Sequence, residues 1–138
     1  MYVFTAKPTI KRSINSNEND AKLVETLSGL PIILSCPTNG GVPPPSIYWF
    51  KDNSNSNNNY TTINSHERIT PLRETQMQIT APTTIENNNF KIMNAGKTLT
   101  ILNATTADSA IYYCLAKNLA GESKLYFNVS IIGKFYYL

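Results

Sequence analysis

Two cysteines and one tryptophan constrain this chain more than any other feature. Cys36 and Cys114 are the only cysteines among 138 residues, and the single tryptophan, Trp49, follows the first of them by 13 positions (49 − 36). The second cysteine closes the run Asp108-Ser109-Ala110-Ile111-Tyr112-Tyr113-Cys114. Both cysteines end segments in which every second residue is apolar, a pattern typical of strands that bury one face.

The rest of the chain also predicts strands rather than helices. Ile47 and Trp49 share one face of 47–51, and the apolar residues of 52–97 do not keep the i, i+3, i+4 rhythm of a helix. Asparagine-rich runs at 53–59 and 87–89 indicate solvated loops. The fold class is therefore all-β. Strands are expected at 22–27, 31–36, 47–51, 61–63, 76–80, 90–93, 98–102 and 126–130.

Charge and hydropathy argue against two classes of function. The net charge is +3, with lysine and arginine scattered along the chain rather than forming a basic stripe with interleaved aromatic residues. Nucleic acid is therefore not expected as a partner. The longest apolar runs are too short to cross a bilayer, and residues 1–8 lack the apolar core of a secretory signal peptide.

Catalytic and metal-binding patterns are not found in the sequence. His66 is the only histidine, and it lies in a polar stretch far from both cysteines, so no ligand cluster is expected. Carboxylates such as Glu67 and Glu74 are ordinary solvated charges. The sequence predicts no enzyme activity, no metal, no cofactor and no small-molecule substrate.

A dispersed set of residues resembles the immunoglobulin superfamily. The set comprises Leu34-x-Cys36, Trp49, Leu99-x-Ile101, Asp108-x-Ala110-x-Tyr112-x-Cys114 and Ala116-x-Asn118-x-x-Gly121. The tail of the pattern looks most like the I-set domains of cell-adhesion molecules. The resemblance implies a two-sheet Greek-key sandwich with one inter-sheet disulfide, between Cys36 and Cys114, against which Trp49 packs.

The same resemblance suggests boundaries and further structural roles. The domain is expected at 8–132, with 1–7 as a linker or the end of a preceding domain and 133–138 as a linker or the start of the next segment. Tyr112 is expected to form a tyrosine corner, its hydroxyl bonded to backbone upstream. Leu99 would lie in the core. Asp108 would fix the turn before Tyr112, through hydrogen bonds or a basic partner, either Lys91 or Arg68.

The cysteine spacing departs from the I-set pattern. The two cysteines are 78 positions apart (114 − 36), which is close to variable-type domains with two additional strands. Either extra strands or asparagine-rich insertions fill 52–97. The I-set and V-set assignments both stay open.

The implied disulfide favours an oxidising compartment. Since the chain lacks a signal peptide, it is expected to be a piece of a longer secreted or membrane-anchored protein. Sequons at Asn59, Asn103 and Asn128 fit that location, although 17 asparagines yield about three sequons by chance. All three are expected to face water.

Alternation also predicts a candidate binding face. On strands that an immunoglobulin sheet places side by side, the outward residues form one apolar, aromatic set. Alternatively, the 52–97 segment covers this set, or the residues are merely tolerated there. The set consists of Tyr48, Phe50, Ile111, Tyr113, Leu115 and Tyr126.

These patterns favour an extracellular protein–protein recognition module of a multi-domain cell-adhesion molecule or receptor. Its partners are expected to be other proteins, immunoglobulin-type domains above all, in homophilic or heterophilic contacts, with membrane attachment only through parts outside this chain. Two alternatives are a structural domain of an intracellular muscle or cytoskeletal array, and an accessory domain of a receptor kinase or matrix enzyme.

Overall fold

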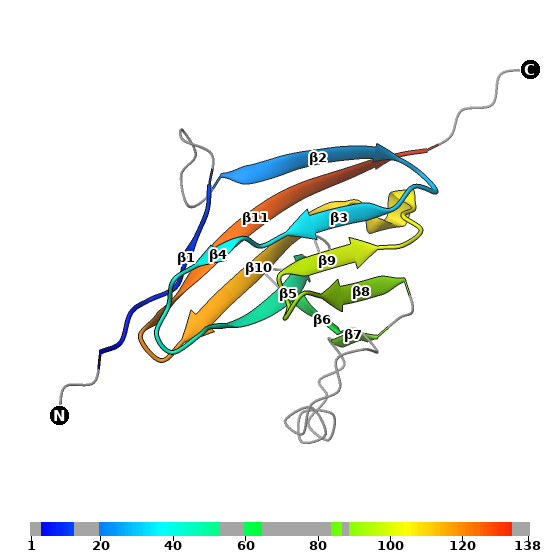
Figure 1. Cartoon of the computed structure of the whole chain (residues 1–138). Helices are drawn as coiled ribbons and strands as arrows, with labels where there is room; N and C mark the ends of the chain where they lie inside the picture. Colours follow the sequence, from blue (N-terminus) through cyan, green and yellow to red (C-terminus); the bar gives the residue numbers. More distant parts are fainter. Residues whose placement is uncertain (1–3, 13–19, 53–59, 65–83, 87–88, 134–138) are drawn as a thin grey trace, which may run out of the picture.

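A computed structural model describes residues 4–12, 20–52, 60–64, 84–86 and 89–133 (Figure 1). Eleven strands and one three-residue 3₁₀ helix occur in these ranges. The elements are β1 (Thr9–Ile10), β2 (Ala21–Leu27), β3 (Ile32–Ser35), β4 (Thr38–Asn39), β5 (Ser46–Asp52), β6 (Tyr60–Asn64), β7 (Thr84–Glu86), β8 (Phe90–Met93), β9 (Thr98–Ile101), η1 (Thr106–Asp108), β10 (Ala110–Asn118) and β11 (Gly121–Ile132).

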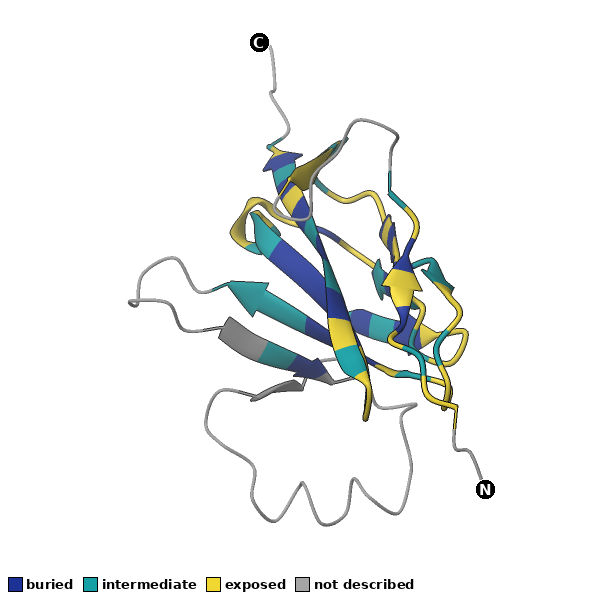
Figure 2. Cartoon of the chain, turned by 90° about the vertical axis from the view of Figure 1, so that its left-hand side faces the viewer, coloured by how far each residue is buried: buried dark blue, intermediate teal, exposed yellow. Residues whose placement is uncertain are grey.

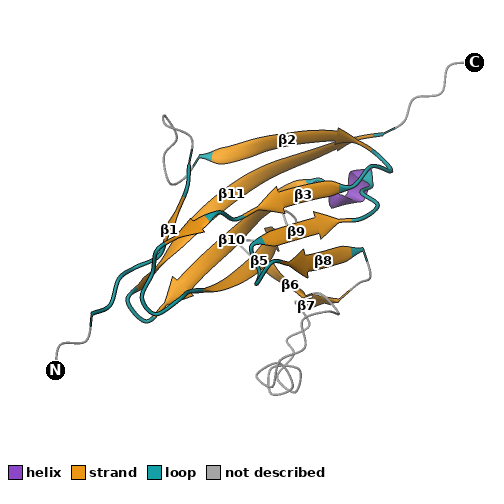
Figure 3. Cartoon of the chain, viewed as in Figure 1, coloured by secondary structure: helices purple, strands orange, loops and turns teal. Residues whose placement is uncertain are grey.

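The strands form two facing sheets, which confirms the predicted all-β sandwich (Figure 3). The larger sheet has the order β2-β11-β10-β5-β6-β7, and the smaller has the order β3-β9-β8. A short β1–β4 pair adds a third ladder. The chain passes between the sheets from β3 to β5 and from β9 to β10, so that neighbours within a sheet are distant in sequence.

Period-two patterning explains why these segments are strands. In β3, Ile32 and Leu34 are buried while Ile33 and Ser35 are exposed. In β11, every second residue from Ser123 to Ile131 is buried. Figure 2 shows this alternation along the strands of both sheets. Each strand therefore contributes one apolar face to the space between the sheets.

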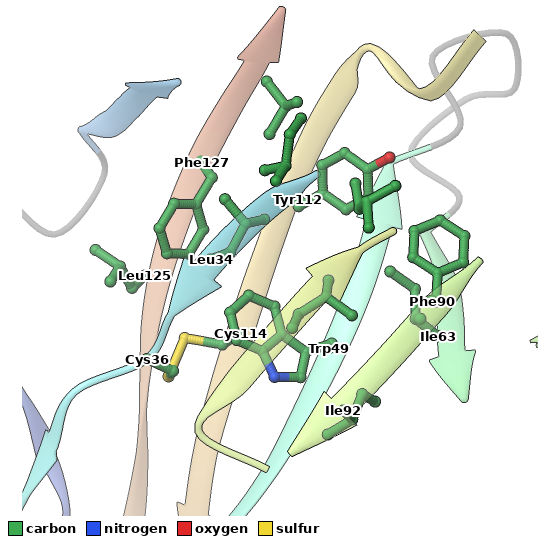
Figure 4. Packing of buried hydrophobic residues seen from close by; sticks show 14 of the residues in the cluster. Leu34, Cys36, Trp49, Ile63, Phe90, Ile92, Tyr112, Cys114, Leu125 and Phe127 are labelled. Carbon is green, nitrogen blue, oxygen red and sulfur yellow. A yellow bond between two sulfur atoms is a disulfide. The ribbon is translucent and has the colours of Figure 1, made fainter. Parts of the chain in front are cut away.

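A disulfide joins the two sheets at the centre of the core (Figure 4). Cys36, just after β3, bonds to Cys114 of β10, which confirms the pairing implied by the resemblance. Trp49 is the cross-strand partner of Cys114 and is fully buried. Its ring lies 5.8 Å from that of Phe127, and its indole Nε1 donates a hydrogen bond to the Gly96 carbonyl at 2.7 Å. The one polar atom of the indole is thus satisfied inside the core.

Extra strands account for part of the long cysteine spacing. β6 pairs antiparallel with the edge of β5, and β7 pairs parallel with β6. These strands widen the larger sheet beyond β5, as variable-type domains do. The strand expected at 76–80 lies outside the described residues.

The disulfide should carry a large share of the stability. Replacing both Cys36 and Cys114 by alanine reopens a loop of 78 residues. Because the unfolded chain then gains entropy, the free energy of unfolding should fall by about 4.5 kcal/mol. Urea titrations followed by Trp49 fluorescence will measure the loss. Reduced wild-type protein is the matched control and should unfold at the same urea concentration as the double variant. Equal stability of oxidised and reduced protein would contradict the expectation.

Candidate protein-binding face

The six residues of the candidate face come together on the outer side of the larger sheet. They lie on the three adjacent strands β5, β10 and β11. Tyr113 is the cross-strand partner of both Phe50 and Tyr126, and Leu115 is the partner of Tyr48. We call the set Tyr48, Phe50, Ile111, Tyr113, Leu115 and Tyr126 the aromatic face.

Ring stacking organises the centre of the aromatic face. The Phe50 and Tyr113 rings are stacked, with centroids 4.8 Å apart and an interplanar angle of 17°. The Tyr126 ring lies 5.2 Å from Tyr113 on the other side. The Lys124 ammonium approaches the Tyr113 ring, 5.4 Å from its centroid, within the range of a cation–π interaction. Three aromatic rings and one cation therefore form a continuous row across three strands.

The aromatic face is less open than simple alternation suggests. Tyr113 points outward yet is only 8% exposed. The other five residues are half-buried rather than exposed. The physical reason is that Tyr113 lies between two rings and a lysine, which cover it from both sides. Tyr113 is thus an internal support of the aromatic face, and its neighbours supply the accessible surface.

Three further residues share this outer surface and were not singled out from the sequence. Lys124 lies two residues from Tyr126, and Asp52 lies two residues from Phe50. Because residues two apart on a strand face the same side, alternation along the strands could have identified both. Leu23 of β2 is 59% exposed and is the cross-strand partner of Asn128. Its position depends on the parallel pairing of β2 with β11, for which the sequence holds no local signal.

The two sequons within the described residues occupy different surfaces. Asn128 is exposed on β11, between Leu23 and Ile111 on the neighbouring strands. Asn103 is exposed after β9, and its backbone N–H donates to the Asn89 side chain at 2.7 Å. A glycan on Asn128 would therefore lie beside the aromatic face, whereas one on Asn103 would lie at the end of the smaller sheet. Asn59 falls outside the described residues.

Tyr112 and Asp108 shape the turn that leads into β10. The Tyr112 hydroxyl donates to the Asp108 carbonyl at 2.6 Å. The Asp108 carboxylate accepts from the Thr105 backbone N–H at 2.9 Å and closes a capping box around η1. Burial, and secondarily the charge of Asp108, raise the pKa of the Tyr112 hydroxyl. Of the two basic partners considered for Asp108, Arg68 lies outside the described residues.

Asn118 connects three segments at the opposite end of β10. Its amide Nδ2 donates to the carbonyls of Ala6, at 2.7 Å, and Pro43, at 2.9 Å. Its Oδ1 accepts from the backbone N–H groups of Ala120 and Gly121. This side chain therefore fixes the β10–β11 turn against the segment before β1 and the loop before β5.

A cavity of about 470 Å³ lies at the side of the sandwich between β3 and β11. Leu125 and Phe127 contribute its apolar lining, and Lys11 and Lys22 also line it. Arg12 extends into this region and donates to the Lys124 carbonyl, while its Nη1 is buried without a hydrogen-bond partner among the described residues. Arg12 thus ties the chain after β1 to β11.

Catalytic geometry does not emerge from the part of the chain that the structure describes. Within those residues no three His, Cys, Asp or Glu side chains gather as a metal site would require. His66, Glu67 and Glu74 lie outside them. None of the described helices has the length and hydrophobicity needed to span a membrane.

Comparison with known proteins places the chain among immunoglobulin domains. A family model described as immunoglobulin domain matches residues 7–118. Hemicentin-1 of Homo sapiens is 32% identical over 92 residues, which cover 67% of this chain and 1% of hemicentin-1. Hemicentin-2 of Mus musculus is 27% identical over 124 residues, which cover 90% of this chain and 2% of that protein. The chain therefore spans a very small part of these relatives.

Solved structures share the fold at low sequence identity. The N-terminal four Ig domains of Dscam1 isoform 4.4 match with a TM-score of 0.65 and 18% identity, over 94% of this chain and 26% of that one. The neural ectodermal development factor IMP-L2 matches with a TM-score of 0.61 and 18% identity, over 96% of this chain and 48% of that one.

Removing the Tyr112 hydroxyl should destabilise the domain. In Tyr112→Phe the partly buried Asp108 carbonyl loses its donor from the fully buried Tyr112 side chain, which costs about 1–3 kcal/mol of unfolding free energy. Urea denaturation at pH 7 will measure the change. Tyr126→Phe, which also removes a hydroxyl but on the aromatic face, is the matched control and should stay within about 0.5 kcal/mol of wild type.

The pH dependence offers a second readout of the same hydroxyl. Because the raised pKa keeps Tyr112 neutral in the folded state, the unfolded chain loses this proton first, near the ordinary tyrosine pKa of about 10. Wild-type stability should therefore fall as the pH rises above that value. The fall should be shallower in Tyr112→Phe, and identical slopes would refute the assignment.

Proposed function

This chain belongs to the immunoglobulin domain family, and we propose that it is a non-catalytic extracellular module that recognises another protein. The proposed domain comprises residues 8–132, with 1–7 and 133–138 as connections to neighbouring segments. The aromatic face is the proposed contact surface. The observation that carries the proposal is the row of three packed aromatic rings on β5, β10 and β11.

The disulfide supports the extracellular location. Bonds of this kind persist in oxidising compartments and are rare in the cytosol. The Cys36–Cys114 bond lies at the centre of the core, where it joins the two sheets and is expected to carry a large share of the domain's stability. This argues for a secreted or cell-surface protein over a structural domain of an intracellular array.

The course of the chain supports a place in a multi-domain molecule. Figure 1 shows β1 and the end of β11 at opposite ends of the sandwich, so the described chain enters at one end and leaves at the other. The Dscam1 structures contain four Ig domains, of which this chain matches about a quarter. A domain with this course can be joined to others in a row.

The composition of the aromatic face supports protein binding. Tyrosine and phenylalanine are enriched in protein–protein interfaces, because they contribute large contact areas with little loss of side-chain entropy. Tyr48, Phe50 and Tyr126 are half-buried and retain accessible surface. Lys124 and Asp52 add charge near the rings, where charge contributes to specificity.

An oxidised core distinguishes the extracellular proposal from the intracellular alternative. Protein secreted from a eukaryotic host should contain no free thiol, and glycosidase treatment should lower its mass through Asn103. Thiol titration under denaturing conditions and glycopeptide mass spectrometry will measure both properties. Two free thiols together with unmodified asparagines in the secreted, folded protein would favour the intracellular array.

Charge on the aromatic face should weaken partner binding without unfolding the domain. Tyr48→Glu and Leu115→Glu act on accessible cross-strand neighbours, and each should lower affinity by about tenfold or more. Tyr113 is unsuitable because it is almost buried. Multimerised protein tested against purified secreted and cell-surface ectodomains provides the assay. Lys97→Asp, at an exposed turn between β8 and β9, is the control, and equal effects of all three changes would reject this surface.

A further inference from the structure

We propose that the partner of the aromatic face is a second copy of the same domain, docked crosswise through a two-fold axis at Tyr113. This inference rests on the proposed function, since it identifies the partner of the same surface. Its support is the placement of opposite charges and exposed apolar residues around Tyr113.

Tyr113 is the geometric centre of the surface. It lies on β10, and its cross-strand partners are Tyr126 on β11 and Phe50 on β5. Leu115 and Ile111 lie two residues away from it in the two directions along β10, with the same outward parity. Two outward residues that lie at equal distances from Tyr113 in opposite directions are therefore placed symmetrically about it.

Lys124 and Asp52 occupy such positions. Lys124 is the cross-strand partner of Leu115, so it lies one strand to the β11 side and two residues toward Leu115. Asp52 lies one strand to the β5 side and two residues beyond Phe50, away from Leu115. With strand spacing of about 4.8 Å and a rise of about 3.3 Å per residue, each Cα lies about 8 Å from that of Tyr113.

A two-fold axis can use this arrangement twice. If the axis passes through Tyr113 in the plane of contact, perpendicular to the line from Lys124 to Asp52, each lysine faces the aspartate of the other copy. A self-complementary interface of this kind is what two-fold symmetry requires. The same spacings make the strands of the two copies cross at about 70°, within the range of orthogonal sheet packing.

Leu23 falls on the same axis. It lies two strands from Tyr113, and its partner Asn128 is opposite Ile111. Leu23 therefore lies two strand spacings across the sheet from Tyr113 and two residues along it, which places it on the line of the proposed axis. The Leu23 residues of the two copies would meet there. Burial of a side chain that is 59% exposed in the single domain stabilises the contact through the hydrophobic effect.

The size of the surface predicts a weak association. The outward residues of four strands span about 20 by 20 Å, so two copies bury on the order of 800 Å² in total. Contacts of this size are transient, and the expected dissociation constant lies between about 10 μM and 1 mM. Many copies acting together on apposed surfaces would strengthen such a contact through avidity.

Asn128 gives the contact a means of regulation. It lies between Leu23 and Ile111, beside the proposed axis. A glycan on this side chain would occupy the space that the second copy needs. Association should therefore require an unmodified Asn128.

The test uses the full chain from a host that does not glycosylate it, studied by sedimentation velocity up to about 1 mM. Wild type should show concentration-dependent dimers. Asp52→Lys and Lys124→Asp should each weaken self-association about tenfold, because each brings like charges together. When these two variants are mixed, opposite charges meet again at both contacts and dimers should return. Lys97→Asp is the matched control and should dimerise as wild type does.

The glycan provides a second arm. Protein secreted with a glycan on Asn128 should stay monomeric, and Asn128→Gln from the same host should dimerise. Three results would overturn the proposal, and each of them alone would be enough. The first is wild type that remains monomeric without the glycan. The second is that the single charge reversals have no effect on self-association, and the third is that the mixture of the two variants fails to recover dimers. Glycosylated protein that dimerises equally well would do the same.

The result separates the second-copy proposal from the more general function. If wild type stays monomeric while Tyr48→Glu abolishes binding to a purified ectodomain, the aromatic face binds a different protein, and only the self-association is wrong. If neither self-association nor ectodomain binding depends on this surface, both proposals fail.

Discussion

The bond between Cys36 and Cys114 sets the parity of the whole larger sheet. Because Cys114 points between the sheets, Tyr112 and Ala116 on either side of it point inward as well, and all three are buried. The pairing of β10 with β5 and β11 extends this parity to Trp49 and Leu125, the cross-strand partners of Cys114. Every intervening residue on the three strands must then face outward. The aromatic face is thus a geometric consequence of the same constraint that builds the core.

Much of this arrangement is contained in local sequence. The strands expected at 31–36, 47–51, 90–93 and 98–102 coincide closely with β3, β5, β8 and β9, because one buried face produces a period of two within a single segment. The outward positions of Tyr48 and Phe50 follow from the same period. That the two cysteines are bonded to each other follows from the dispersed family pattern, since the presence of two cysteines in a sequence does not by itself show that they form a disulfide.

Other features depend on contacts between distant segments, which no local pattern encodes. The burial of Tyr113 comes from rings on two neighbouring strands. The position of Leu23 comes from the parallel pairing of β2 with β11. The bonds from Asn118 reach carbonyls more than 70 residues away in sequence. The alternation of residues within one strand therefore identifies the side chains that face outward. Their exposure to solvent depends in addition on how much of each side chain the residues of neighbouring strands cover.

The parallel pairing of β2 with β11 also has a mechanical consequence. The chain enters β2 at Ala21 and leaves β11 at Ile132, and these points lie at opposite ends of the ladder between the two strands. Tension applied between Ala21 and Ile132 would act along both strands and load their shared hydrogen bonds together. A ladder loaded in shear resists rupture better than one opened bond by bond. Inside this seam, the disulfide limits how far the chain between β3 and β10 can extend.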